Sequence, residues 1–233
     1  MATASRAGAM GPALGADFLL HGAFCAAHQA WHLLEDAVAL FRRRSYPTSL
    51  ALSVFCLEEI GRAKFYLEQR DAVLAGDIVT PGILAGKRTR NHVWKLVQAE
   101  IPVTVGFASA GEPPAPGSPE EIALGERLIR LRKVLEESEP KRAHSQRLSA
   151  LYVDVHPGGS HWLTPSRSIR KEESEEKLGA ADLAYALFRI ALVEPQPGSE
   201  MDRAVKRLAN PPKLPERHWD NWTWEPEESK SLR

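Results

Sequence analysis

The sequence lacks an excess of charge of either sign: 30 Lys and Arg residues balance 30 Asp and Glu residues among 233. A globally basic surface for nucleic acid is therefore excluded, although a local basic patch is not. Cysteine is scarce, and the apolar helical surroundings of Cys25 and Cys56 favour buried free thiols over a disulfide framework. No apolar run is long enough for a convincing signal peptide or membrane span. We therefore expect a cytoplasmic protein with no membrane contact.

Internal repeats are also absent, and the length suits one domain. We expect a flexible leader at residues 1–16, a helical domain at residues 17–208 and a tail at residues 209–233. The tail is rich in proline and tryptophan, and it either docks on the domain or binds a partner.

Apolar residues recur every three or four positions along most of the domain, which predicts an all-α antiparallel bundle. Helices are expected at residues 17–44, 47–75, 81–100, 118–139, 171–193 and 199–208. Residues 148–155 and 161–163 are instead rich in β-branched and aromatic side chains, which predicts a small extended hairpin with Tyr152 and Asp154 on one side. The helix at residues 171–193 is expected to bury Leu183, Leu187, Ile190 and Ala191.

The second expected helix is the most informative segment. From Leu50 to Leu57 it is apolar in nearly every direction, which predicts the most buried helix of the bundle. Glu58, Glu59 and Arg62 then interrupt the apolar surface within one arc of about 100°. The spacing of Glu58 and Arg62 allows an ion pair. Two interpretations stay open: a buried structural ion network, or a polar pocket with a function.

Four side chains on the first expected helix invite a metal interpretation, because His residues four apart can share a zinc ion. They are His21, His28, His32 and Glu35. Their stripe lies opposite the centre of the apolar face, so we interpret it as a solvated face. We predict no metal site and no cofactor.

A basic cluster, KRTRNHVWK, follows at residues 87–95. Arg88 and Arg90 are expected on a solvated face, where they are candidates for substrate binding. His92 and Lys95 lie three residues apart on one helical face, which adjacent apolar residues predict to be partly buried.

Four short motifs occur in order along the chain: LLEDA at 33–37, EEIGR at 58–62, HVWK at 92–95 and LYVD at 151–154. Together they resemble AbiV-type abortive infection proteins of the HEPN superfamily, whose second helix carries Glu-Glu-Leu-Gly-Lys. The resemblance covers residues 18–195. It implies a HEPN-like helical bundle, a role in anti-phage defence and a homodimer.

The resemblance also implies site residues. Those with a catalytic role are Glu58, Glu59, Arg62, His92 and Lys95, and those that bind substrate are Arg88, Arg90, Tyr152 and Asp154. His92 acts as general acid or base on this view, Arg62 and Lys95 stabilise charge, and a glutamate orients His92 or Arg62. HEPN ribonucleases carry Arg, four to six residues, then His. Here only three residues separate Arg88 from His92, and Arg90 has no His at the expected distance.

Helix geometry bears on whether these residues share one site. If one helix ran from residue 81 to residue 100, His92 would lie opposite Arg62 to Tyr66 and away from Glu58. Two functions stay open. The protein is a defence effector that acts on RNA or translation through its polar site, with metal-independent ribonuclease activity undecided. Alternatively, it is a non-catalytic defence protein that binds a phage or host protein through the tail or the proline-rich loop.

Overall fold

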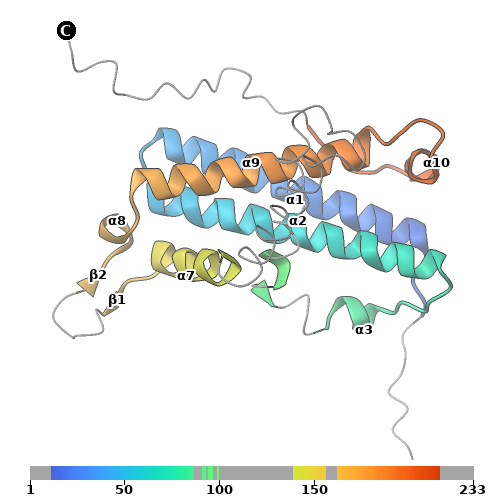
Figure 1. Cartoon of the computed structure of the whole chain (residues 1–233), viewed down its shortest axis with the longest axis horizontal. Coiled ribbons are helices and arrows are strands. Elements are labelled where there is room, and N and C mark those ends of the chain that lie inside the picture. Colours follow the sequence, from blue (N-terminus) through green and yellow to red (C-terminus); the bar gives the residue numbers. More distant parts are fainter. Residues whose placement is uncertain are drawn as a thin grey trace, which may run out of the picture.

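The computed structural model describes residues 12–86, 91–92, 94–96, 99, 139–155 and 162–215. Its elements are α1 (Ala16–Arg42), α2 (Tyr46–Leu74), α3 (Pro81–Leu84), α7 (Glu139–Leu151), β1 (Asp154–Val155), β2 (Trp162–Leu163), α8 (Pro165–Ser168), α9 (Lys171–Val193) and α10 (Glu200–Arg207). Within these ranges the fold is a helical bundle with one two-residue hairpin, so the predicted all-α class is confirmed (Figure 1).

The helices α1 and α2 form a long antiparallel hairpin, as the short link between them predicts. Arg44 turns the chain with φ of 62°, and Pro47 lies in the first turn of α2, where its missing N–H is tolerated. The hydroxyl of Ser49 donates to the carbonyl of Ala37 at 2.8 Å, so the start of α2 packs against the end of α1.

The helix α2 lies at the centre of the bundle, in contact with α1, α7, α8 and α9 (Figure 1). It has thirteen buried residues, against ten in α1 and nine in α9, which confirms it as the most buried element. Its apolar run explains this position, because a helix without a polar face must be covered on several sides. The charged residues that interrupt that run are consequently held among neighbouring helices.

The predicted helix at residues 81–100 is wrong. It ends at Leu84, Asn91 is not helical, and the described helical residues resume at His92. Gly82 and Gly86 weaken the helix here, because glycine loses the most backbone entropy on ordering. A continuous helix would fix the position of His92 along α2. Because the helix is interrupted, His92 can lie at a different position along α2.

The predicted hairpin is also shorter than expected. Residues 148–151 belong to α7, and only Asp154 and Val155 pair with β2, opposite Leu163 and Trp162. A helical bond from the amide of Tyr152 to Leu148 extends the last turn. The helix prevails because its residues at helical spacing are buried, namely Ala143, Arg147 and Ala150.

The bounds of α9 match the prediction, but its buried face does not. Leu183 and Leu187 are half-buried, Ala191 is exposed and Ile190 is 48 % exposed. The buried face is formed by Leu178, Ala181, Ala184, Tyr185, Phe188 and Leu192. The small residues of this set let α9 approach α1 and α2, so packing rather than side-chain size decides which face is buried.

The helix α10 packs against α1 and α9, near the end of α2 that carries Arg70. Its bounds lie within the expected helix at residues 199–208, and Ser199 caps it by accepting a hydrogen bond from the amide of Asp202. Arg70, buried in α2, donates to both carboxylate oxygens of Glu200. The predicted helix at residues 118–139 falls outside the described residues apart from its end, as do residues 1–11 of the leader and 216–233 of the tail. No described helix meets the length and apolarity required to cross a membrane.

Candidate functional site

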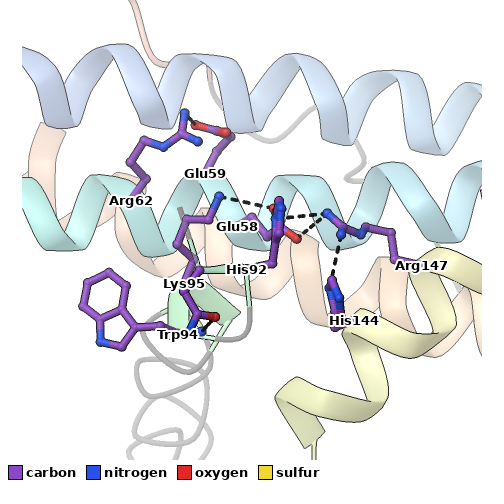
Figure 2. Close-up of polar contacts among 9 residues, drawn as sticks. Glu58, Glu59, Arg62, His92, Trp94, Lys95, His144 and Arg147 are labelled. Atoms are coloured by element: carbon purple, nitrogen blue, oxygen red, sulfur yellow. Dashed lines mark hydrogen bonds and ion pairs between the residues drawn. The ribbon is translucent and has the colours of Figure 1, made fainter. Parts of the chain in front are cut away.

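A buried carboxylate lies at the centre of the polar site. Glu58, which is 2 % exposed, accepts a hydrogen bond from Nη1 of Arg147 on Oε1 at 2.9 Å. Its Oε2 lies 2.6 Å from Nδ1 of His92 and 3.4 Å from Nζ of Lys95 (Figure 2). We call Glu58, His92, Lys95, His144 and Arg147 the Glu58 cluster. A carboxylate at this depth is tolerated because cations and hydrogen bonds surround it.

Gly61 lets the segment that carries His92 and Lys95 approach α2. A Cβ atom at position 61 would lie 1.9 Å from the carbonyl oxygen of Lys95, far inside van der Waals contact. The glycine of the EEIGR motif therefore allows two backbones to touch. Since the helix from residue 81 is interrupted, His92 meets Glu58, and the expectation that it lies opposite Arg62 to Tyr66 is wrong.

The helix α7 supplies two residues that the sequence analysis missed, His144 and Arg147. The guanidinium of Arg147 is nearly buried, with 7 % of the side chain exposed, and it lies over the ring of Phe55 at 5.1 Å. Its Nη2 lies 3.1 Å from Nδ1 of His144. One signal was available: a His followed three residues later by a cation occurs both at His92 and at His144.

The hydrogen-bond partners determine the tautomers of the two histidines. Arginine only donates, so Nδ1 of His144 accepts and its ring proton lies on Nε2. Burial first, and the charge of Arg147 second, lower the pKa of His144 and favour this neutral form. Nδ1 of His92 faces a carboxylate and therefore donates, which leaves Nε2 as an acceptor in the neutral ring. The 3.1 Å approach of Arg147 to that Nδ1 joins two donors and is not a hydrogen bond.

The two imidazoles lie side by side and reach solvent. Their ring centroids are 5.6 Å apart at an interplanar angle of 19°, and the side chain of His92 is 43 % exposed. His144 is half-buried. One exposed ring therefore offers a base and its neighbour an N–H donor, while the buried Glu58 carboxylate beneath them is paired with two cations.

Glu59 and Arg62 form a separate pair, with Nη1 of Arg62 2.8 Å from Oε2 of Glu59. They leave α2 on the side that faces α1, whereas Glu58 faces the other way (Figure 2). The spacing of Glu58 and Arg62 allows an ion pair, but Arg62 pairs with Glu59 instead, and Glu58 pairs with Lys95 and Arg147. Burial, the largest influence, raises the pKa of Glu59, against the opposing charges of Arg62 and Lys95. Glu58 is therefore part of a buried ion network, whereas Glu59 and Arg62 line a pocket.

Of the remaining predicted site residues, the structure describes the side chain of Tyr152, which is not among the contacts of the Glu58 cluster. Tyr152 follows α7 and is 62 % exposed. Asp154 contributes its backbone to β1, and its side chain lies outside the described part of the structure. Arg88 and Arg90 also lie outside the described residues.

No metal site is evident in the described part of the chain, where no group of three or more His, Cys, Asp and Glu residues could hold a metal ion. The rings of His28 and His32 contact each other edge to face at 4.5 Å. Burial first, and His32 second, lower the pKa of His28. In the Glu58 cluster, Lys95 and Arg147 occupy the positions around the carboxylate that a cation would take.

Fold and site together define a small helical domain in which a polar cluster is built on the central helix. The sequence profile of the AbiV family of HEPN proteins matches residues 18–186, and the chain belongs to this family. The resemblance inferred from the four motifs is thereby confirmed. No curated protein and no solved structure matches the chain. Membership of the AbiV family indicates abortive-infection defence.

Proposed function

We propose that the protein is an anti-phage effector that cleaves RNA at the Glu58 cluster without a metal ion. The observation that carries this proposal is the pair of adjacent histidines, His92 and His144, held in opposite tautomers at a partly exposed surface. Metal-independent cleavage of a phosphodiester requires a group that takes and returns a proton, and a hydrogen-bond donor that stabilises the charge on the phosphate. This pair supplies both.

In the proposed reaction, Nε2 of His92 takes the proton of a ribose 2′-hydroxyl. The 2′-oxygen attacks the adjacent phosphorus, the bond to the 5′-oxygen breaks, and the proton held by His92 passes to that leaving oxygen. Glu58 accepts the Nδ1–H of His92 and stabilises the imidazolium that forms. His144 donates its Nε2–H to a non-bridging phosphate oxygen. The products are a 2′,3′-cyclic phosphate and a 5′-hydroxyl.

Lys95 and Arg147 act in this proposal as positioning residues. Both are buried and contact Glu58, so they fix the direction of its carboxylate. Arg62 is assigned no part in the step, because it pairs with Glu59. The cluster therefore works through its two imidazole rings.

The test compares phage protection and RNA integrity in cells that carry the wild type, His92→Ala or Glu58→Gln. His32→Ala serves as the control, since His32 is an exposed histidine of α1 outside the Glu58 cluster. We expect the wild type and the control to protect and to yield fragments with 2′,3′-cyclic phosphate ends, also from purified protein in EDTA. A His92→Ala variant that still cuts RNA, or wild-type protection with intact RNA, contradicts the proposal.

A second candidate is a non-catalytic defence protein that binds a phage or host protein. It is favoured by the burial of Lys95 and Arg147, whose charges are used to neutralise Glu58 and are withdrawn from solvent. In that case wild-type protection coexists with intact RNA, and His92→Ala remains protective as long as it folds. The same experiment therefore separates the two functions.

A further inference from the structure

A concave site lies beside the Glu59–Arg62 pair, and its lining contains no residue of the Glu58 cluster. It has a volume of about 350 Å³ between α1 and α2, with Leu84 of α3 beside it. We call it the α1–α2 pocket, and it is lined by Phe18, Leu19, Gly22, Cys25, Ala26, Gln29, Glu59, Arg62, Tyr66 and Leu84. The volume is at the small end of the range for ligand sites.

Most of the lining is apolar, and one wall is an aromatic ring. Gly22 makes space for this wall, because a Cβ at position 22 would lie 3.2 Å from Cδ2 of Tyr66. Phe18 is 62 % exposed. Aromatic and aliphatic walls of this kind suit a flat ligand with apolar faces.

The polar part of the pocket is the Glu59–Arg62 pair. Their mutual contact joins Oε2 of Glu59 to Nη1 of Arg62. Among the described residues, no recorded contact uses Oε1 of Glu59 or the other guanidinium N–H groups. An acceptor and a donor therefore stand next to each other at the pocket. They match a ligand edge that carries a donor beside an acceptor.

We propose that the α1–α2 pocket binds a purine base. A purine is flat and apolar on its faces, and it stacks on aromatic side chains such as Tyr66. Adenine carries its N6 amino donor beside N7, and guanine carries N1–H beside O6, so either edge pairs with Glu59 and Arg62. Uracil also carries N3–H beside O4, so the preference for a purine rests on the larger ring that stacks on Tyr66. The base comes either from a free nucleoside or nucleotide or from RNA, and the test separates these sources. The proposal does not depend on RNA cleavage at the Glu58 cluster.

Cys25 provides a direct assay. It is exposed and lines the pocket, whereas the other cysteine, Cys56, is fully buried, so a thiol reagent modifies Cys25 first. Because burial raises the pKa of Cys25, labelling is followed at alkaline pH. Guanosine, adenosine, uridine and a short single-stranded oligoribonucleotide are titrated against the labelling rate. We expect a purine nucleoside to protect Cys25 at least tenfold more strongly than uridine.

Matched variants test whether Glu59 and Arg62 bind the polar edge of the purine. Glu59→Gln and Arg62→Lys, both close in shape to the wild type, should weaken purine protection at least tenfold, with circular dichroism confirming the fold. In Gly179→Ala, which changes a residue of α9 outside the pocket lining, a purine nucleoside should slow the labelling of Cys25 as it does in the wild type. If only the purine-containing oligoribonucleotide protects, with the same dependence on Glu59 and Arg62, RNA is the source of the base. No protection at millimolar nucleoside and oligonucleotide, equal protection by uridine, or protection unchanged in both pocket variants overturns the proposal.

Discussion

The close approach at Gly61 makes Gly61→Ala the most informative single substitution. An added Cβ would lie 1.9 Å from the carbonyl oxygen of Lys95, whereas ordinary contact begins at 3.4 Å. The neighbouring backbone must therefore move by about 1.5 Å, the difference between the two distances. Because the obstacle is a backbone carbonyl, no side-chain rotation relieves it.

The displacement is large compared with the contacts of the Glu58 cluster. His92 lies 2.6 Å from Glu58, and a shift of this size away from α2 removes the hydrogen bond. Overpacking of a core contact costs about 1–3 kcal/mol, and the better helix propensity of Ala returns about 0.5–1 kcal/mol. We expect a folded protein destabilised by about 1–2 kcal/mol. Misplacement of a reacting group by about 1 Å is expected to lower activity ~100-fold.

Gly179→Ala is the matched control, since a Cβ at position 179 of α9 meets nothing within 4 Å. It should leave activity unchanged and stabilise the protein by up to about 1 kcal/mol. Urea titration measures stability, and phage challenge with RNA analysis measures function. If Gly61→Ala is as stable and as protective as Gly179→Ala, the close-approach argument is refuted.

Further predictions concern the charged groups. Arg147→Ala should lower the free energy of unfolding by about 3 kcal/mol, because its buried ion pair with Glu58 is broken while the pair with Lys95 remains. Arg62→Ala should lower it by less than about 1 kcal/mol, since the side chain of Arg62 is 35 % exposed. Urea titrations measure both values. Burial raises the pKa of Glu59, so the stability associated with its protonated form is lost as pH rises above the ordinary value of 4.5. Glu59→Gln should therefore raise the melting temperature at about pH 7 and not at about pH 4. Because the pKa of His144 is lowered, the contribution of its neutral form to stability is complete above pH 6.5, the ordinary pKa, and is lost as the pH falls below that value. In thermal melts at acid pH, His144→Gln should therefore lose less stability than the wild type. Light scattering at micromolar concentration should report a homodimer, and a monomer would count against that prediction.

The long helices could be predicted because their signals are local. Residues 50–57 are apolar on every side, which places α2 inside the bundle whatever its neighbours are. The bounds of α9 followed in the same way from its charged start and apolar end. The buried face of α9 could not be predicted in this way, since Ala181 and Ala184 are buried because they fit the space beside the neighbouring helices and not because they are strongly hydrophobic.

The composition of the Glu58 cluster could be predicted only in part. Glu58, His92 and Lys95 belong to recognisable motifs, but Arg147 lies 89 residues from Glu58 and no local pattern indicates which helix faces that carboxylate. The approach of the segment that carries Lys95 to Gly61 is likewise a contact between parts of the chain that are distant in sequence. Sequence periodicity was insufficient to predict contacts between segments that are distant along the chain.

The distance along the chain between Glu58 and Arg147 has a consequence for the timing of synthesis. At ~5–20 residues per second, the ribosome adds the intervening 89 residues in roughly 4–18 s. During that interval the nascent α1–α2 hairpin carries a carboxylate whose guanidinium partner does not yet exist. Lys95 is made earlier and can already pair with Oε2 of Glu58, but the donor to Oε1 is Arg147 of α7. The Glu58 cluster is therefore complete only after α7 has been made.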